Sequence, residues 1–152
     1  SGVTFAGVCV GRSASTKDFL KRFNVWQDAF PAQASEQLSE LTCLAKAGHA
    51  AAAENDGAAF LSVLTEYGEC LGGLGEAMGA DIVTRAHREI GNEAKRYSVS
   101  YKISGAGGGD LGLAFSADTG ALKAFLRKME NSQYKIINFG LDRRGLCIDG
   151  HI

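Results

Sequence analysis

The chain has 152 residues and a mass of 16.0 kDa, the size of one ordinary domain, and 45% of its residues are hydrophobic and 22% charged. This composition argues against a disordered chain, and a net charge of −1 argues against a basic protein that binds nucleic acid or membrane surfaces. No apolar run approaches the roughly 18 residues of a membrane span and no signal peptide opens the chain, so we expect a cytoplasmic protein. The 20 glycines stand out, because average usage would give about 11.

Four cysteines lie far apart in the sequence, at Cys9, Cys43, Cys70 and Cys147. They form no CxxC pair and have no histidine nearby at zinc-finger spacing. Three of them have apolar neighbours, and a free cysteine commonly behaves as a small core hydrophobe. We therefore expect reduced structural thiols, with a disulfide or a zinc site as the alternatives.

The first half of the chain reads as one strand followed by helices. Residues 3–10 (VTFAGVCV) are apolar on both alternating faces, which predicts a buried strand. Hydroxyl residues ahead of Asp18 are a helix-start signal. An alanine-rich helix is then expected over about 34–54, a break at 55–57, and a second long helix in which apolar residues recur from Phe60 to Met78.

Four glycines interrupt the second long helix, although each costs about 1 kcal/mol relative to alanine in a helix interior. They are Gly68, Gly72, Gly73 and Gly75. Close helix packing, a break near Gly72 and Gly73, and the approach of a ligand to the backbone are the three interpretations.

In the second half of the chain, apolar and polar residues alternate with a period of two. After a more polar helix over 82–96, strands are expected over 97–104 and 111–116, and Asp118 can cap a further helix. Two final strands are expected near 134–139 and 145–149. This order predicts one α+β domain, with an antiparallel sheet and helices packed on one face.

The histidines offer no catalytic constellation. We expect His49 at the surface or core edge, His87 as an exposed helix residue, and His151 at a frayed terminus. No Ser/His/Asp or Cys/His arrangement can be argued from the spacing, so no catalytic residue and no metal ligand is identified.

A glycine-rich loop lies between the two middle strands, over residues 104–110 (SGAGGGD). Four glycines in five positions let main-chain N–H groups converge on an anion, or let the loop pack against another backbone. A purely structural hairpin remains an alternative. Gly107, Gly109 and Gly112 satisfy GxGxxG, but a strand follows instead of a helix, so the Rossmann interpretation fails. No P-loop pattern is present.

Two segments resemble the GHMP kinases. Residues 102–110 (KISGAGGGD) resemble the third conserved motif of that family, and residues 11–18 (GRSASTKD) resemble the segment that opens the C-terminal half of phosphomevalonate kinases. The resemblance covers nearly the whole chain. Asp110 stands where mevalonate kinases carry another glycine, which favours the phosphomevalonate kinase subgroup. Residues 142–144 resemble the family's late turn, although a solvated hairpin tip also explains them.

The resemblance implies a ferredoxin-like C-terminal domain of an ATP- and Mg²⁺-dependent kinase that acts on 5-phosphomevalonate in isoprenoid biosynthesis. The family's phosphate loop (P-x-x-x-G-L-G-S-S-A) and its N-terminal lysine and acidic residue are absent from these 152 residues. We therefore expect residues 1–152 to be a single domain without its ATP-binding N-terminal partner, inactive alone, with Ser1 and Gly2 as an expression scar. The alternatives are another GHMP kinase, acting on mevalonate or a sugar, and a non-catalytic ligand-binding or dimerisation module.

The resemblance also supplies candidate residues for binding the phosphate or the substrate. They are Ser13, Ala14, Ser15, Thr16, Lys102, Ser104, Gly105, Ala106, Gly107, Gly108, Gly109 and Asp110. The hydroxyls of Ser13, Ser15 and Thr16 cap a helix, bind the acceptor, or do both. Lys102 pairs with phosphate or with Asp110, or is solvated. Asp110 holds the loop through its N–H groups or contacts magnesium.

Overall fold

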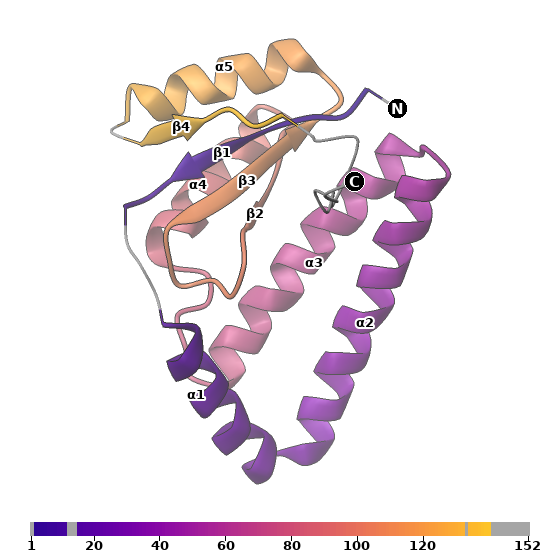
Figure 1. The fold of residues 1–152 in the computed structure, drawn as a ribbon, viewed down its shortest axis with the longest axis vertical. Coiled ribbons are helices and arrows are strands. Elements are labelled where there is room, and N and C mark those ends of the chain that lie inside the picture. Colours follow the sequence, from indigo (N-terminus) through magenta and orange to yellow (C-terminus); the bar gives the residue numbers. More distant parts are fainter. Residues whose placement is uncertain (1, 12–14, 133, 141–152) are drawn as a thin grey trace, which may run out of the picture.

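The computed structural model describes residues 2–11, 15–132 and 134–140 (Figure 1). In chain order, the elements are β1 (Thr4–Cys9), α1 (Thr16–Ala29), α2 (Pro31–Ala53), α3 (Gly57–Ala77), α4 (Arg85–Arg96), β2 (Ser100–Ile103), β3 (Leu111–Ser116), α5 (Thr119–Glu130) and β4 (Lys135–Ile137). The expected strand at 145–149, the 142–144 turn, Cys147 and His151 lie outside the described residues. None of the described helices is long and apolar enough to cross a membrane.

The four described strands form one antiparallel sheet in the order β2-β3-β1-β4. This is the strand order of a ferredoxin-like domain, so the expected α+β fold is confirmed. The helices α1 to α4 all occur in the connection between β1 and β2. The α2–α3 hairpin extends to one side of the sheet, and α4 and α5 lie over a face of it (Figure 1).

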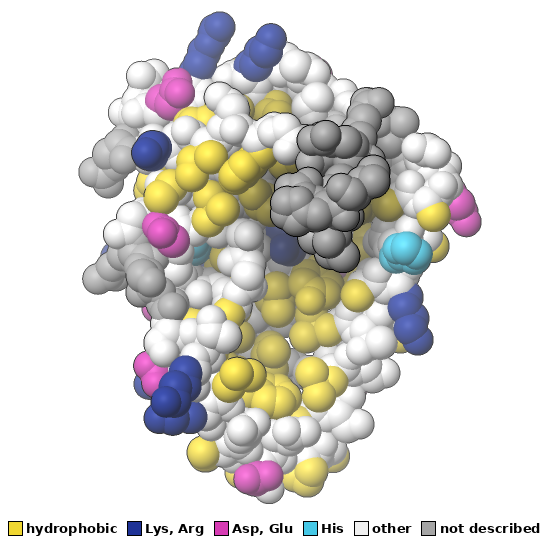
Figure 2. Space-filling model, viewed as in Figure 1, with side chains coloured by type: hydrophobic (Ala, Val, Ile, Leu, Met, Phe, Trp, Pro, Cys, Tyr) yellow, Lys and Arg dark blue, Asp and Glu magenta, His cyan; other side chains and the backbone are white. Residues whose placement is uncertain are grey.

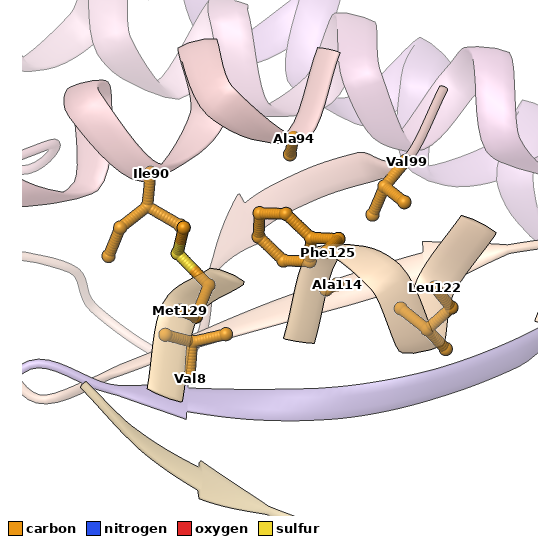
Figure 3. Close-up of a cluster of buried hydrophobic side chains, with 8 residues drawn as sticks. All are labelled: Val8, Ile90, Ala94, Val99, Ala114, Leu122, Phe125 and Met129. Carbon is orange, nitrogen blue, oxygen red and sulfur yellow. The ribbon is translucent and has the colours of Figure 1, made fainter. Parts of the chain in front are cut away.

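The main core lies between the sheet and the helices α4 and α5 (Figure 3). The helix α5 begins at Asp118, whose Oδ1 accepts hydrogen bonds from Gly120 N (2.7 Å) and Ala121 N (3.1 Å), so the expected cap is confirmed. Apolar residues at helical spacing then face the sheet. The buried cluster comprises Val8, Ile90, Ala94, Val99, Ala114, Leu122, Phe125 and Met129.

The hairpin helix α3 also packs against the edge strand β2. Its Gly68 lies so close that a Cβ there would be 3.4 Å from the Lys102 Cβ, and Thr65 Oγ1 lies 3.2 Å from Ser100 Oγ. Figure 2 shows hydrophobic side chains in the hollow between the sheet and the hairpin. A cavity of about 300 Å³ opens there, between residues of α2 and α3, with Tyr67 and Lys102 in its wall.

The glycines of α3 do not break the helix, which continues to Ala77, so of the three interpretations a break near Gly72 and Gly73 is wrong. Close packing explains Gly75 instead. A Cβ at Gly75 would lie 2.7 Å from the Ala80 carbonyl oxygen and 3.0 Å from the Ile82 Cβ. The chain turns back at this point, and only glycine lets it do so at that distance.

The helix α4 begins three residues later than the sequence pattern predicts. Thr84 is its N-cap, and Thr84 Oγ1 accepts from His87 N at 3.4 Å. Ile82 precedes the helix and is buried, because its side chain belongs to a second cluster that includes Trp26 and Ile103. This position leaves its carbonyl group available to the glycine loop.

The three described cysteines are free, but they are not core residues. Cys43 is exposed, and Cys9 and Cys70 are half-buried, so these three are free thiols as expected, although none of them is fully buried. Cys43 lies on the outer face of α2, where its apolar neighbours in sequence point elsewhere. Among the described residues, no group of three or more histidine, cysteine, aspartate or glutamate side chains could hold a metal ion.

Cys70 and Cys43 are expected to differ strongly in reactivity. Burial, with Glu40 beside the thiol, raises the pKa of Cys70 to about 11, so about one thiol in a thousand ionises at pH 8. Iodoacetamide at pH 8, followed by peptide mass spectrometry, should alkylate Cys43 at least about tenfold faster. Unfolding in urea should bring the rates together. Equal rates in the folded chain would contradict the packing of Cys70 against α2.

Candidate phosphate-binding site

The glycine loop between β2 and β3 is a tight excursion with three residues in the left-handed region. Ser104 N donates to Leu111 O at 2.9 Å and closes the base of the loop. Gly105, Gly107 and Gly108 then adopt φ values of +69°, +80° and +65°. Side chains other than glycine rarely adopt this conformation, so the sequence of glycines is required by the backbone path.

The tip of the loop presents main-chain donors. Gly105 and Ala106 are exposed, and the N–H groups of Gly105, Ala106 and Gly107 have no hydrogen-bond partner within the described part of the chain. Gly108 N instead donates to Ile82 O at 2.6 Å, which fixes the second half of the loop. Successive free N–H groups in a left-handed turn suit an anion.

The end of β1, directly before the 11–18 segment, contacts the glycine loop. Val10 N donates to Asp110 O at 2.7 Å, and the Cys9 thiol donates to Asp110 Oδ1 at 3.2 Å. The segment that resembles the opening of the C-terminal half begins with Gly11, directly after these contacts. Two motifs about ninety residues apart in sequence therefore share one end of the sheet.

The helix α1 begins at this end of the sheet. Ser13 and Ala14 lie outside the described residues. Ser15 is the N-cap, and its Oγ accepts from Asp18 N at 3.3 Å, so the capping interpretation is confirmed. Both Ser15 and Thr16 are exposed. The first-turn N–H groups of α1 carry the positive end of the helix dipole, which favours negative charge.

The Asp110 carboxylate is exposed and accepts its hydrogen bond from the Cys9 thiol on β1, and not from the loop N–H groups. The residue still holds the loop, but it does so against β1. A single exposed carboxylate does not form a magnesium site, and among the described residues no group of three or more histidine, cysteine, aspartate or glutamate side chains lies there.

Lys102 is neither solvated nor paired with Asp110. It is half-buried, its Nζ donates to Ile103 O at 2.8 Å, and it lies 5.7 Å from the centre of the Tyr67 ring. Burial lowers the pKa of its ammonium group. The alternation of β2 turns Lys102 toward α3, where Gly68 leaves room for its stem.

His87 is only 2% exposed, so the expectation of an exposed helix residue is wrong. Its Nδ1 lies 2.7 Å from the Tyr101 hydroxyl and its Nε2 lies 3.0 Å from Gly109 O. Burial lowers the pKa of the imidazole, and the bond to Gly109 opposes that effect only in part. The signal was present in the sequence, because His87, Ile90 and Ala94 occupy one face of α4. His49, by contrast, is exposed as expected.

A cavity of about 250 Å³ lies behind the loop, between α3 and α4 and beside β2. His87, Tyr101 and Lys102 contribute to its wall. Gly68, Gly72 and Gly91 also line it, and the absence of side chains at these positions keeps it open.

Comparison with known proteins gives structural matches only. No family model matches the sequence, and no curated protein matches it. The crystal structure of a Lin0012 protein from Listeria innocua has a TM-score of 0.87 and 24% identity over 92% of this chain and 39% of that one. L. major mevalonate kinase in complex with R-mevalonate has a TM-score of 0.71 and 16% identity over 89% and 43% of the two chains.

Streptococcus pneumoniae phosphomevalonate kinase, in complex with phosphomevalonate and AMPPNP, has a TM-score of 0.64 and 19% identity over 88% of this chain and 37% of that one. This chain therefore spans about two fifths of the length of the structures that it matches. At these identities the likeness concerns the fold. The chain has the same α+β fold as the matched parts of the solved mevalonate and phosphomevalonate kinases.

Proposed function

We propose that this chain is the C-terminal domain of a GHMP-type kinase, and specifically of a phosphomevalonate kinase. The reaction moves the γ-phosphoryl group of ATP onto the phosphate of 5-phosphomevalonate and yields ADP and 5-diphosphomevalonate. The cytoplasm is the proposed location. The ATP-binding phosphate loop would lie in an N-terminal domain of the same polypeptide, because these 152 residues contain no such loop.

The observation that carries the proposal is the hydrogen bond from Val10, the residue directly before the 11–18 segment, to Asp110 at the end of the glycine loop. It brings the exposed amides of the glycine loop to the end of the sheet where α1 begins. Phosphoryl transfer depends mainly on positioning and on stabilising negative charge spread over oxygens. The amides of Gly105, Ala106 and Gly107 would donate to phosphoryl oxygens, and Ser15 and Thr16 would receive the acceptor's phosphate or carboxylate.

Exposed apolar side chains support a neighbouring domain as the partner. Leu20 and Val25 of α1 are 57% and 72% exposed, and Phe30 between α1 and α2 is 51% exposed. The hollow between the sheet and the hairpin is also apolar (Figure 2). Apolar surface of this kind is commonly covered by another domain. Magnesium would arrive with the nucleotide, held by its phosphates and by groups outside the described residues.

The proposal is tested by ADP release from the complete polypeptide that carries this chain, with 5-phosphomevalonate and mevalonate compared as acceptors. Turnover with the phosphorylated acceptor alone is the expected result, and the 152-residue chain by itself should give none. Turnover with mevalonate would keep a GHMP kinase and overturn the acceptor. A lack of turnover with either acceptor would overturn the assignment to this reaction.

A further inference from the structure

A buried chain of hydrogen bonds links β2, α4 and the glycine loop. Tyr101 on β2 contacts His87 Nδ1 at 2.7 Å, and His87 Nε2 contacts Gly109 O at 3.0 Å. Gly109 is itself buried, one residue before the exposed Asp110. The link spans elements that are distant in sequence and ends on the backbone of the loop.

The partners of the imidazole determine where its proton lies. A carbonyl oxygen can only accept, so Nε2 must carry the hydrogen in the bond to Gly109. Burial lowers the pKa of His87 and favours the neutral ring. Nδ1 of a neutral Nε2–H ring is an acceptor, so the Tyr101 hydroxyl must donate to it. Tyr101 thereby selects the tautomer that can bind Gly109.

Several charged side chains lie near this chain of hydrogen bonds without bonding to the imidazole. Glu69 and Glu76 of α3, Arg88 and Lys95 of α4, and Lys102 of β2 line the same cavity as His87, and Asp110 follows Gly109. Lys95 is paired with Glu69 at 3.1 Å, and Arg88 with Asp81 at 3.4 Å. Among the described residues, the hydrogen bonds of the imidazole go only to Tyr101 and Gly109.

We propose that His87 is a positioning residue for the glycine loop, held in its Nε2–H tautomer by Tyr101. The Gly109 carbonyl is anchored by His87 and the adjacent Gly108 amide by Ile82 O, at 2.6 Å. These two anchors hold the peptide units on either side of the Gly108–Gly109 bond, and so orient the free amides of residues 105–107 that precede them. The part of this inference that concerns phosphate rests on the proposed kinase function, whereas the tautomer and the anchoring do not.

Protonation would disturb the link. A second proton on Nδ1 faces the Tyr101 hydroxyl, which must then turn its own hydrogen away from a donor. Because the folded-state pKa of His87 lies below that of the unfolded chain, the stability that depends on the neutral ring is lost as the pH falls below about 6.5 toward the folded-state value. The Nε2–H of a protonated ring still donates to Gly109 O, so acid disturbs the bond with Tyr101 and leaves the anchor on Gly109 in place.

The first test measures the tautomer in this 152-residue chain by the ¹⁵N chemical shifts of His87 at pH 7.5. A protonated-type shift for Nε2 and an unprotonated-type shift for Nδ1 are expected. The opposite assignment, or a doubly protonated ring, would overturn the proposal. This measurement does not depend on any kinase activity.

The second test uses two substitutions of His87, each of which replaces only one of the two ring nitrogens by a side-chain amide. In His87→Gln the Nε2 amide can still donate to Gly109 O, whereas in His87→Asn the Oδ1 can only replace Nδ1 and accept from Tyr101. Amide hydrogen exchange at Gly108 should become at least about tenfold faster in the Asn variant than in the Gln variant. Equal exchange in the two variants would overturn the anchoring role.

Kinetics of the complete polypeptide provide the third readout. His87→Asn should lower kcat about tenfold or more, whereas His87→Gln, which keeps the donor to Gly109 O, should stay within about threefold. Equal kcat values for the two variants would overturn the positioning role. If the wild-type polypeptide shows no kinase activity, the proposed function fails, and the tautomer and exchange measurements still decide the anchoring.

Discussion

Gly107→Ala should lower phosphoryl transfer by the complete polypeptide at least about 100-fold and destabilise this chain by about 3 kcal/mol. The residue has φ +80°, and a Cβ there would lie 2.5 Å from Ile82 O and 2.7 Å from Ile103 Cδ1. The first of these neighbours is backbone and cannot rotate away. The same carbonyl accepts the Gly108 amide at 2.6 Å, so relieving the contact breaks an anchor of the loop.

Gly79→Ala is the matched control for backbone strain. Gly79 has φ +62° and no atom within 4 Å of an added Cβ, and it lies after α3 rather than in the loop. Its replacement should cost about 1 kcal/mol, the price of the left-handed conformation alone, and leave kcat unchanged. Urea denaturation and ADP release at saturating substrates measure the two effects. If both variants lose the same stability and keep kcat, the contact of the loop with Ile82 is wrong.

Local signals were sufficient for most of the fold. The buried strand at 3–10 and the Asp118 cap follow from alternation and from side chains that satisfy free N–H groups, and both involve neighbours in sequence. The start of α4 was placed three residues too early because Ile82 looks like a helix residue by its period. Tertiary packing buries it under α1 instead, which no local pattern records.

In the candidate site, too, the local sequence predicts one part, and the other part depends on tertiary contacts. The glycine loop was found from its composition, because only glycine fits three positive φ angles in four residues. The partners of its flanking residues were not found. Asp110 meets Cys9 across 101 residues of sequence, and His87 lies 22 residues from Gly109. Both contacts exist because of the order of strands in the sheet and the packing of α4 on it, and not because of any spacing along the chain.

Gly91 and Gly112 both lie against the half-buried Tyr101, and Gly112 leaves less room for an added Cβ. Gly112 lies on β3 diagonally across from Tyr101, whose register partner is Ala114. A Cβ at Gly112 would overlap the Tyr101 hydroxyl and approach Cε2 to 2.7 Å. Gly112→Ala should therefore destabilise the chain by about 2–3 kcal/mol, because the ring must leave its place against His87.

A double-mutant cycle tests this contact by urea denaturation. Tyr101→Ala alone leaves a cavity and is destabilising, but once the ring is gone, adding Gly112→Ala should cost little more. The coupling free energy should be about 2 kcal/mol. Tyr101→Phe, which keeps the ring, should not rescue Gly112→Ala, and this separates the overlap with the ring from the loss of the hydroxyl. Additive effects would mean that Tyr101 does not lie over Gly112. The hydroxyl would then lack the position from which it donates to His87, and the tautomer that anchors the loop would have no other group to select it.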